Sequence, residues 1–166
     1  MSHTTHSTYA IPFYLSYGAM QIITPTCNIP VVPTVMLDAV SANSFSGTGS
    51  VSRDAPKHFM IPLQCAGKSG AAQIGVSFSS AYRDASGAPG VIKTDQGANR
   101  ASGVGLKIVN ETTRQPISFD TLEPGPTPFK TTGTNNFPFS VNYFQTGAKI
   151  TPGNVTGRVE VSIAYQ

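Results

Sequence analysis

Apolar and polar residues alternate in ITPGNVTGRVEVSIAYQ, the last seventeen residues of the sequence. One parity holds Val155, Gly157, Val159, Val161, Ile163 and Tyr165. The other parity is mostly polar and includes Thr156, Arg158 and Glu160. A period of two predicts a β-strand with one buried face. No turn and no returning strand follow it in this sequence, so the pattern leaves open what covers the strand's outer edge.

The same period recurs along the chain, whereas helical periodicity is nearly absent. Further strands are predicted at residues 9–17, 22–27, 35–40, 59–65, 74–78, 105–109, 117–119 and 137–144. Turn signals such as SGTG, ASGAPG and EPGPTP separate them, and residues 83–102 are predicted to form a loop. Many short strands separated by turns indicate an all-β fold, an antiparallel β-sandwich.

Composition narrows the function. Only 11% of the 166 residues are charged, and the net charge of +3 comes from scattered Lys and Arg residues without a basic run. We therefore expect no nucleic-acid partner. No run of 18 apolar residues occurs, so we expect no membrane insertion. The 16 glycines and 13 prolines suit a chain with many turns.

Two cysteines, Cys27 and Cys65, each end an apolar run, IITPTC and FMIPLQC. Such a pair is either two buried thiols or a disulfide between neighbouring strands. In an all-β chain with few charges and many Ser and Thr residues, we favour the disulfide and an oxidising compartment.

No catalytic or metal-binding pattern is present in the sequence. The histidines (His3, His6 and His58) and the two cysteines lack the spacing of a zinc site. AGKSG lacks the earlier glycine of a phosphate-binding loop. The eight carboxylates are dispersed, although folding could pair two of them, as in a sandwich glycosidase. We expect no enzyme activity, no metal and no cofactor.

The amino end, MSHTTHSTYA, has neither the basic start nor the apolar stretch of a secretory signal. Because the cysteine pair indicates export, we expect the natural protein to begin further upstream.

Several motifs together resemble a known family. Cys27 opens the first strand of the main domain, and FMIPLQC places Cys65 at the end of another strand. GVGLKIVNETTRQPI and FSVNYFQTGAKITPGNVTGRVEVSIAYQ follow, with Gly153 fourteenth from the end and Tyr165 penultimate. From about Cys27 to Gln166, the chain resembles a pilin domain of the chaperone–usher fimbriae of bacteria, in the group of type 1 and P pili.

This resemblance implies an incomplete immunoglobulin-like sandwich that lacks its final strand. The terminal strand would border an apolar groove and wait for a strand from another protein. The implied partners are a periplasmic chaperone, an outer-membrane usher and a neighbouring fimbrial subunit. Basic chaperone residues would hold the carboxylate of Gln166. The implied location is the cell-surface fimbria, reached through the periplasm.

The position in the fibre stays open between two alternatives. Residues 1–20 form a separate segment, and residues 21–166 form the pilin domain. In one alternative, residues 9–17 end the receptor-binding domain of a tip adhesin, most of which is missing, together with any glycan site. In the other, they are the donor strand of an adaptor or shaft subunit, with Tyr9, Ile11, Phe13, Leu15 and Tyr17 on one face. Donor strands of the family usually carry a glycine among their apolar positions, whereas Gly18 falls on the opposite parity from Tyr9–Tyr17. The first alternative is therefore favoured.

A different class of function, a free-standing carbohydrate-binding sandwich, is less favoured. Trp is absent and the acidic residues are dispersed, whereas such a module usually displays aromatic platforms or acidic calcium loops. A complete module of that kind would be stable without a partner.

Overall fold

The structure is a computed structural model that describes residues 26–67 and 73–166. Within them it has eight strands: β1 (Thr26–Asn28), β2 (Lys57–Ala66), β3 (Ile74–Phe78), β4 (Val91–Ile92), β5 (Val104–Asn110), β6 (Gln115–Pro116), β7 (Gly133–Gln145) and β8 (Val161–Tyr165). Two 3-10 turns, Ala42–Ser44 and Ser80–Tyr82, are the only helical elements of the described residues. The predicted all-β class is confirmed.

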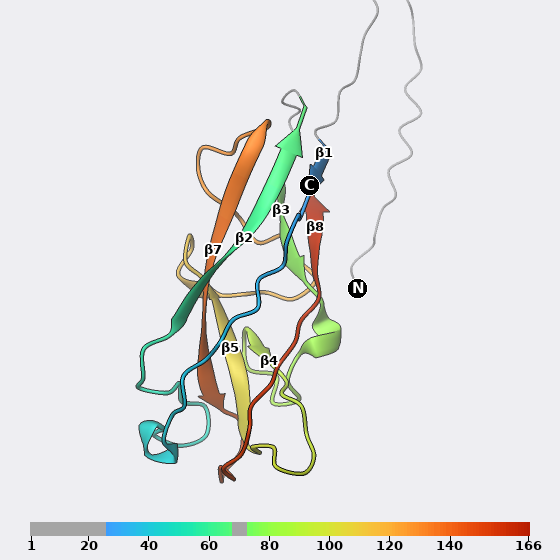
Figure 1. The fold of residues 1–166 in the computed structure, drawn as a ribbon. Helices are drawn as coiled ribbons and strands as arrows, with labels where there is room; N and C mark the ends of the chain where they lie inside the picture. The colour runs from blue at the N-terminus through green and yellow to red at the C-terminus, as the bar shows by residue number, and fades with distance from the viewer. Residues whose placement is uncertain (1–25, 68–72) are drawn as a thin grey trace, which may run out of the picture.

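The larger sheet has the order β1-β2-β7-β5-β4 (Figure 1), and β6 pairs with β5. All its strand pairs are antiparallel. The central strand β7 pairs with β2 from Lys57↔Val141 to Cys65↔Gly133 and, on its other edge, with β5. The inward side chains of these strands form one side of the core.

The smaller sheet consists of β3 and β8, paired antiparallel. Phe78 of β3 meets Phe139 of β7 edge to face, with ring centroids 5.1 Å apart. Phe59 of β2 stacks on the same Phe139 ring at 5.7 Å. Phe78 and Phe139 are at most 1% exposed, so the two sheets close on an aromatic core.

Prolines explain why β1 is short. The Cα atoms of Cys27 and Cys65 are 4.1 Å apart, the spacing of an antiparallel pair without mutual hydrogen bonds. The hydrogen bonds between β1 and β2 are therefore expected at the neighbouring residues, where Asn28 stands opposite Gln64. Two residues further, the same register would bring Pro30 opposite Pro62. Neither proline has an N–H, so strand pairing ends and the chain leaves β2.

Residues 29–40, called the wall segment below, run along the molecule without a sheet partner (Figure 1). Among the described residues, no main-chain to main-chain hydrogen bond involves them. The strand predicted at 35–40 is therefore wrong as a sheet strand. Its alternation is nevertheless present, since Pro33, Val35 and Leu37 are half-buried and Thr34 and Met36 are exposed.

The other predicted strands fared differently. Those at 59–65, 74–78, 105–109 and 137–144 are confirmed as β2, β3, β5 and β7. The strand at 117–119 is wrong, because these residues form a loop in which only Phe119 makes an isolated bridge, to Phe78. The predicted loop at 83–102 contains the short strand β4.

At the two ends the outcome is partial. Of the strand predicted at 155–165, only β8 has continuous partners, because residues before it pass from the edge of β4 to the edge of β3. Of the strand predicted at 22–27, only the part in β1 can be compared. The rest of it, residues 9–17, His3 and His6 lie outside the described residues.

Candidate functional site

Residues 155–166, called the carboxy-terminal strand below, include β8 and form main-chain hydrogen bonds along one edge. Its even-numbered residues form these hydrogen bonds. The N–H of Asp95 donates to the C=O of Thr156 (2.8 Å), and the N–H of Ser79 donates to the C=O of Glu160 (3.0 Å). The main chains of Gln73 and Gln166 bond to each other in both directions, at 2.7 and 2.9 Å. Because alternate residues of a strand point their main-chain groups to opposite edges, the odd-numbered residues face the other way. No strand of the described residues lies on that side.

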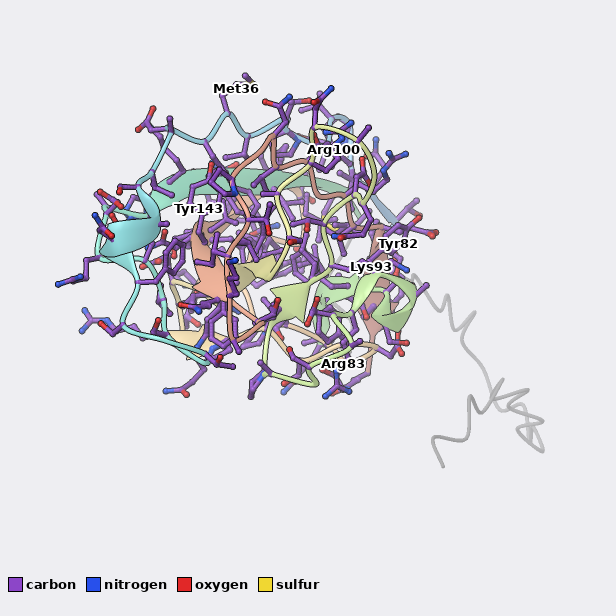
Figure 2. All side chains as sticks on the ribbon, turned by 90° about the horizontal axis from the view of Figure 1, so that it is seen from below. Met36, Tyr82, Arg83, Lys93, Arg100 and Tyr143 are labelled. Atoms are coloured by element: carbon purple, nitrogen blue, oxygen red, sulfur yellow. A yellow bond between two sulfur atoms is a disulfide. The ribbon has the colours of Figure 1, made fainter. Side chains whose placement is uncertain are left out.

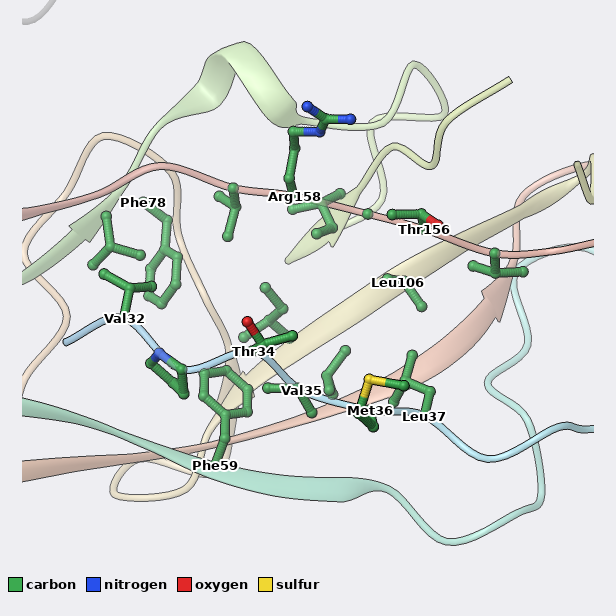
Figure 3. Close-up of a pocket in the computed structure, with 18 of the residues that line it drawn as sticks. Val32, Thr34, Val35, Met36, Leu37, Phe59, Phe78, Leu106, Thr156 and Arg158 are labelled. Carbon is green, nitrogen blue, oxygen red and sulfur yellow. The ribbon is translucent and has the colours of Figure 1, made fainter. Parts of the chain in front are cut away.

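That open edge borders a groove with a volume of about 530 Å³. Figure 3 shows the wall segment along one side and the carboxy-terminal strand along the other. The floor is apolar and comes from both sheets: Phe59, Ile61, Phe78, Ile92, Leu106, Ile108, Val141 and Tyr143. The groove thus joins an unpaired main-chain edge to exposed parts of the core, which is the combination that an added β-strand would cover.

The structure brings four of the predicted groove residues to this site: Val155, Gly157, Val159 and Val161. Ile163 is half-buried and packs against the core cluster. Tyr165 is 52% exposed and, like Gln166, does not line the groove. The predicted site therefore falls into a groove part and a terminal part beyond it.

Sequence reasoning missed the opposite wall and the floor. Val32, Val35 and Leu37 form the wall, and Val32 and Met36 are large apolar side chains with exposures of 55% and 79%. The available signal is the alternation over 33–37 beside Pro30, which overlaps the ordinary strand predicted at 35–40.

Two glycines of the carboxy-terminal segment lie close to neighbouring atoms, and Gly153 is required because those atoms belong to the main chain. A Cβ on Gly153 would lie 2.4 Å from the carbonyl carbon of Arg100 and 2.5 Å from the nitrogen of Ala101. A Cβ on Gly157 would lie 2.7 Å from Leu106 on the groove floor. Gly153, predicted as a motif residue, thus allows the chain to pass against the loop at residues 100–101.

The wall segment is fixed at both ends. At its start, the predicted disulfide is present: Cys27 and Cys65 are bonded and oppose each other in the β1–β2 pair. At its far end, the Tyr143 hydroxyl donates to the C=O of Asp38 (3.0 Å), and Lys57 Nζ lies 2.7 Å from Asp38 Oδ2. Burial, and secondarily the charge of Asp38, raise the pKa of Tyr143, so its hydroxyl keeps the proton that it donates.

The described part of the chain shows no cluster of three or more His, Cys, Asp or Glu side chains placed to hold a metal ion. Within the same residues, no helix is long and apolar enough to cross a membrane.

Together, the fold and the groove define a β-sandwich in which none of the described strands covers the groove beside the carboxy-terminal strand. The model of the family described as "Fimbrial protein" matches residues 17–166. The chain is 31% identical over 135 residues to the uncharacterized fimbrial-like protein YdeS of Escherichia coli K12, covering 80% of this chain and 73% of that protein. The chain belongs to the fimbrial protein family.

Solved structures show the same fold. A Burkholderia pseudomallei antigen and type I fimbria protein superposes with a TM-score of 0.55 at 25% identity, covering 87% of this chain and 99% of that one. The CupB6 tip adhesin of Pseudomonas aeruginosa gives a TM-score of 0.58 at 23% identity, covering 75% of this chain and 33% of the adhesin. A subunit of a chaperone–usher pilus gives 0.59 at 16% identity, covering 84% of this chain and 87% of that one. The immunoglobulin-like pilin fold is therefore confirmed.

Proposed function

We propose that the groove receives a β-strand from another protein, called the donor strand below, and that this step assembles the fimbria. One observation carries the proposal: the odd-numbered main-chain groups of residues 155–161 face an apolar groove in which no strand of the described residues lies. A donor strand would bond to that edge, and its alternate side chains would enter the groove. The role is structural, without catalysis.

The donor would come from two partners in succession. A periplasmic chaperone would first lend a strand, with its basic residues on the carboxylate of Gln166, and at the outer-membrane usher a neighbouring subunit would replace it. The exposed Gln166 supports the first contact. The Cys27–Cys65 disulfide supports passage through an oxidising compartment, and the family supports the surface fimbria as the destination.

Two positions in the fibre each have support. Coverage of one third of the CupB6 tip adhesin suits a domain that anchors a tip adhesin, whose receptor would bind through a domain outside this chain. Coverage of 99% of the Burkholderia protein suits an adaptor or shaft subunit, which would donate residues 9–17 to its neighbour. Binding of a peptide of residues 5–20 to the groove of another pilin domain distinguishes the two positions. Only the donor segment of an adaptor or shaft subunit should bind there.

Thermal unfolding of the oxidised chain tests the function itself. The chain is melted alone, with a peptide of alternating apolar residues, and with a fimbrial chaperone; a form lacking residues 1–20 is treated in parallel. A ligand that binds only the folded state raises the melting temperature, so we expect a rise with either partner. A response by the shortened form alone would show that the amino-terminal segment occupies the groove. Two stable forms that ignore both partners would contradict the proposal and favour a complete binding module.

A further inference from the structure

The groove continues into a second cavity, with a volume of about 790 Å³. Leu37, Tyr143 and Val155 line both spaces, so a strand that passes Val155 enters the second one. Figure 2 views the molecule from this end, with Tyr143 and Arg100 labelled. The cavity lies between the end of the wall segment, the loop at residues 98–101 and the chain at 150–156.

The second cavity differs in chemistry from the groove. One side is apolar, with Leu37, Val40, Phe45, Val104 and Ile150. The other side is polar and carries Asn99, Arg100, Asn154 and Thr156. Among these lining residues Arg100 is the only charged one, so the cavity has a positive charge and no carboxylate.

Arg100 is held in place at this cavity. Its main-chain N–H donates to Gly97 (3.2 Å), and its backbone forms a bridge with Asn154 of the adjacent chain. Its Nη1 donates to the hydroxyl of Thr156 at 2.7 Å. Arg100 is half-buried, and this bond to Thr156 of the carboxy-terminal strand orients its guanidinium.

No carboxylate neutralises Arg100. All eight Asp and Glu residues of the sequence lie within the described ranges. The three ion pairs of these residues, defined within 4.0 Å, join Lys57 to Asp38, His58 to Glu111, and Arg158 to Asp95. Arg158, two residues along the same strand from Thr156, therefore has its partner at 3.1 Å, whereas Arg100 has a hydroxyl.

We propose that the second cavity takes an acidic side chain of the donor strand, and that Arg100 selects donors by binding its carboxylate. A guanidinium held against a neutral hydroxyl retains donor groups for a carboxylate, and a charge-assisted bond of this kind is stronger than a neutral one. The methylene groups of the acidic residue would lie on Leu37 and Val155. This inference rests on the proposed function and adds to it the chemistry of one donor position.

The direction of the donor decides which of its ends carries the acid. The wall segment and the carboxy-terminal strand run in opposite directions past the groove, because in Figure 3 the course from Val32 to Leu37 is opposite to that from Thr156 to Arg158. A donor antiparallel to the carboxy-terminal strand brings its carboxyl-terminal part into the second cavity. A donor parallel to it brings its amino-terminal part there. Peptides with the acid near either end cover both cases.

Binding of designed peptides to the full oxidised chain, refolded in their presence, tests the inference. Peptides of about twelve residues alternate Val and Thr, the length of one long strand, and carry Glu, Gln or Lys near one end. We expect the best Glu peptide to bind about fivefold more tightly than its Gln counterpart, with Lys weakest. Arg100→Gln should abolish this preference, Arg100→Lys should keep part of it, and Arg114→Gln, which changes the net charge equally on a distant turn, should leave it intact. High salt should reduce the preference without removing binding.

The outcomes separate the two claims. Equal binding of all peptides by the parent chain would overturn the selection by Arg100 and leave donor-strand binding standing. A preference that survives in Arg100→Gln would also overturn it. Failure of every peptide to bind would overturn both the inference and the proposed function.

Discussion

Strand β7 and the carboxy-terminal strand show the same alternation in sequence but have different surroundings. β7 pairs along both edges, with β2 and β5, and its inward residues Phe137 and Phe139 are 1% exposed. The carboxy-terminal strand pairs along one edge, and its inward residues Val155, Val159 and Val161 are only half-buried. Alternation reports which face of a strand is buried. It does not report whether both edges are paired, and in this protein the unpaired edge is the candidate site.

The largest expected effect lies in the closed region, that is, the core around β7, whose two edges are both paired. Phe139→Ala removes the ring that contacts both Phe59 and Phe78, so we expect the free energy of unfolding to fall by about 3–5 kcal/mol. Denaturant unfolding should give the same loss with and without a donor peptide. A loss below about 1 kcal/mol would contradict the account of the core.

Removal of the disulfide affects both regions. Cys27→Ser combined with Cys65→Ser opens a link between residues 38 positions apart, and we expect a loss of about 4 kcal/mol on the chain-entropy estimate. The wall segment also loses its fixed start, so donor peptides should bind more weakly. Calorimetry and peptide titration measure the two effects, with the chemically reduced parent chain as control. Unchanged peptide affinity would show that the disulfide does not set the position of the wall.

A substitution inside the groove should weaken binding as well as folding. Val159→Ala removes two carbons from a half-buried position, so we expect a loss of about 1 kcal/mol for the chain alone. Donor peptides should bind about fivefold more weakly, because their side chains lose the same contact. Ser162→Ala, on the exposed face of the same strand, is the matched control for titration. Equal effects of the two variants on binding would place the donor elsewhere.

The smallest effect is a pH dependence outside the groove. Hydrogen bonds from the hydroxyl and the main-chain N–H of Ser80 lower the pKa of Asp120 below its ordinary value of 3.8. The Ser80 nitrogen lies 3.0 Å from Asp120 Oδ1. A lowered folded pKa stabilises the fold at pH values above the ordinary one, and this contribution is lost as the pH falls through the folded value. Asp120→Asn should therefore unfold with a weaker acid dependence below about pH 4 than the parent. Donor affinity at neutral pH should be the same in both, and an unchanged acid dependence would count against this hydrogen bond.

The closed region could be predicted from the sequence, because each of its strands carries its own alternation and turn signals. β2, β3, β5 and β7 lie close to their predicted bounds, and the disulfide follows from two cysteines that end apolar runs. β4 has only two residues, too few for a periodic pattern.

The candidate site could be predicted only on one side. The carboxy-terminal strand has a strong pattern, but its groove also depends on the wall segment, for which the sequence predicts an ordinary strand at 35–40. Its separation from the sheet follows from Pro30 meeting Pro62, which requires the register of β1 and β2 to be known first. Arg100 carries no motif at all, since its position depends on the approach of Gly153 to the loop.

Amide hydrogen exchange along the carboxy-terminal strand is the most direct test of the unpaired edge. In the chain lacking residues 1–20, the N–H groups of Ser162 and Ala164, which face β3, should exchange slowly, whereas those of Val159, Val161 and Ile163 should exchange fast. Addition of a donor peptide should slow the second set and leave the first unchanged. Slow exchange of both sets before any peptide is added would contradict the account, because the edge beside the groove would already be paired.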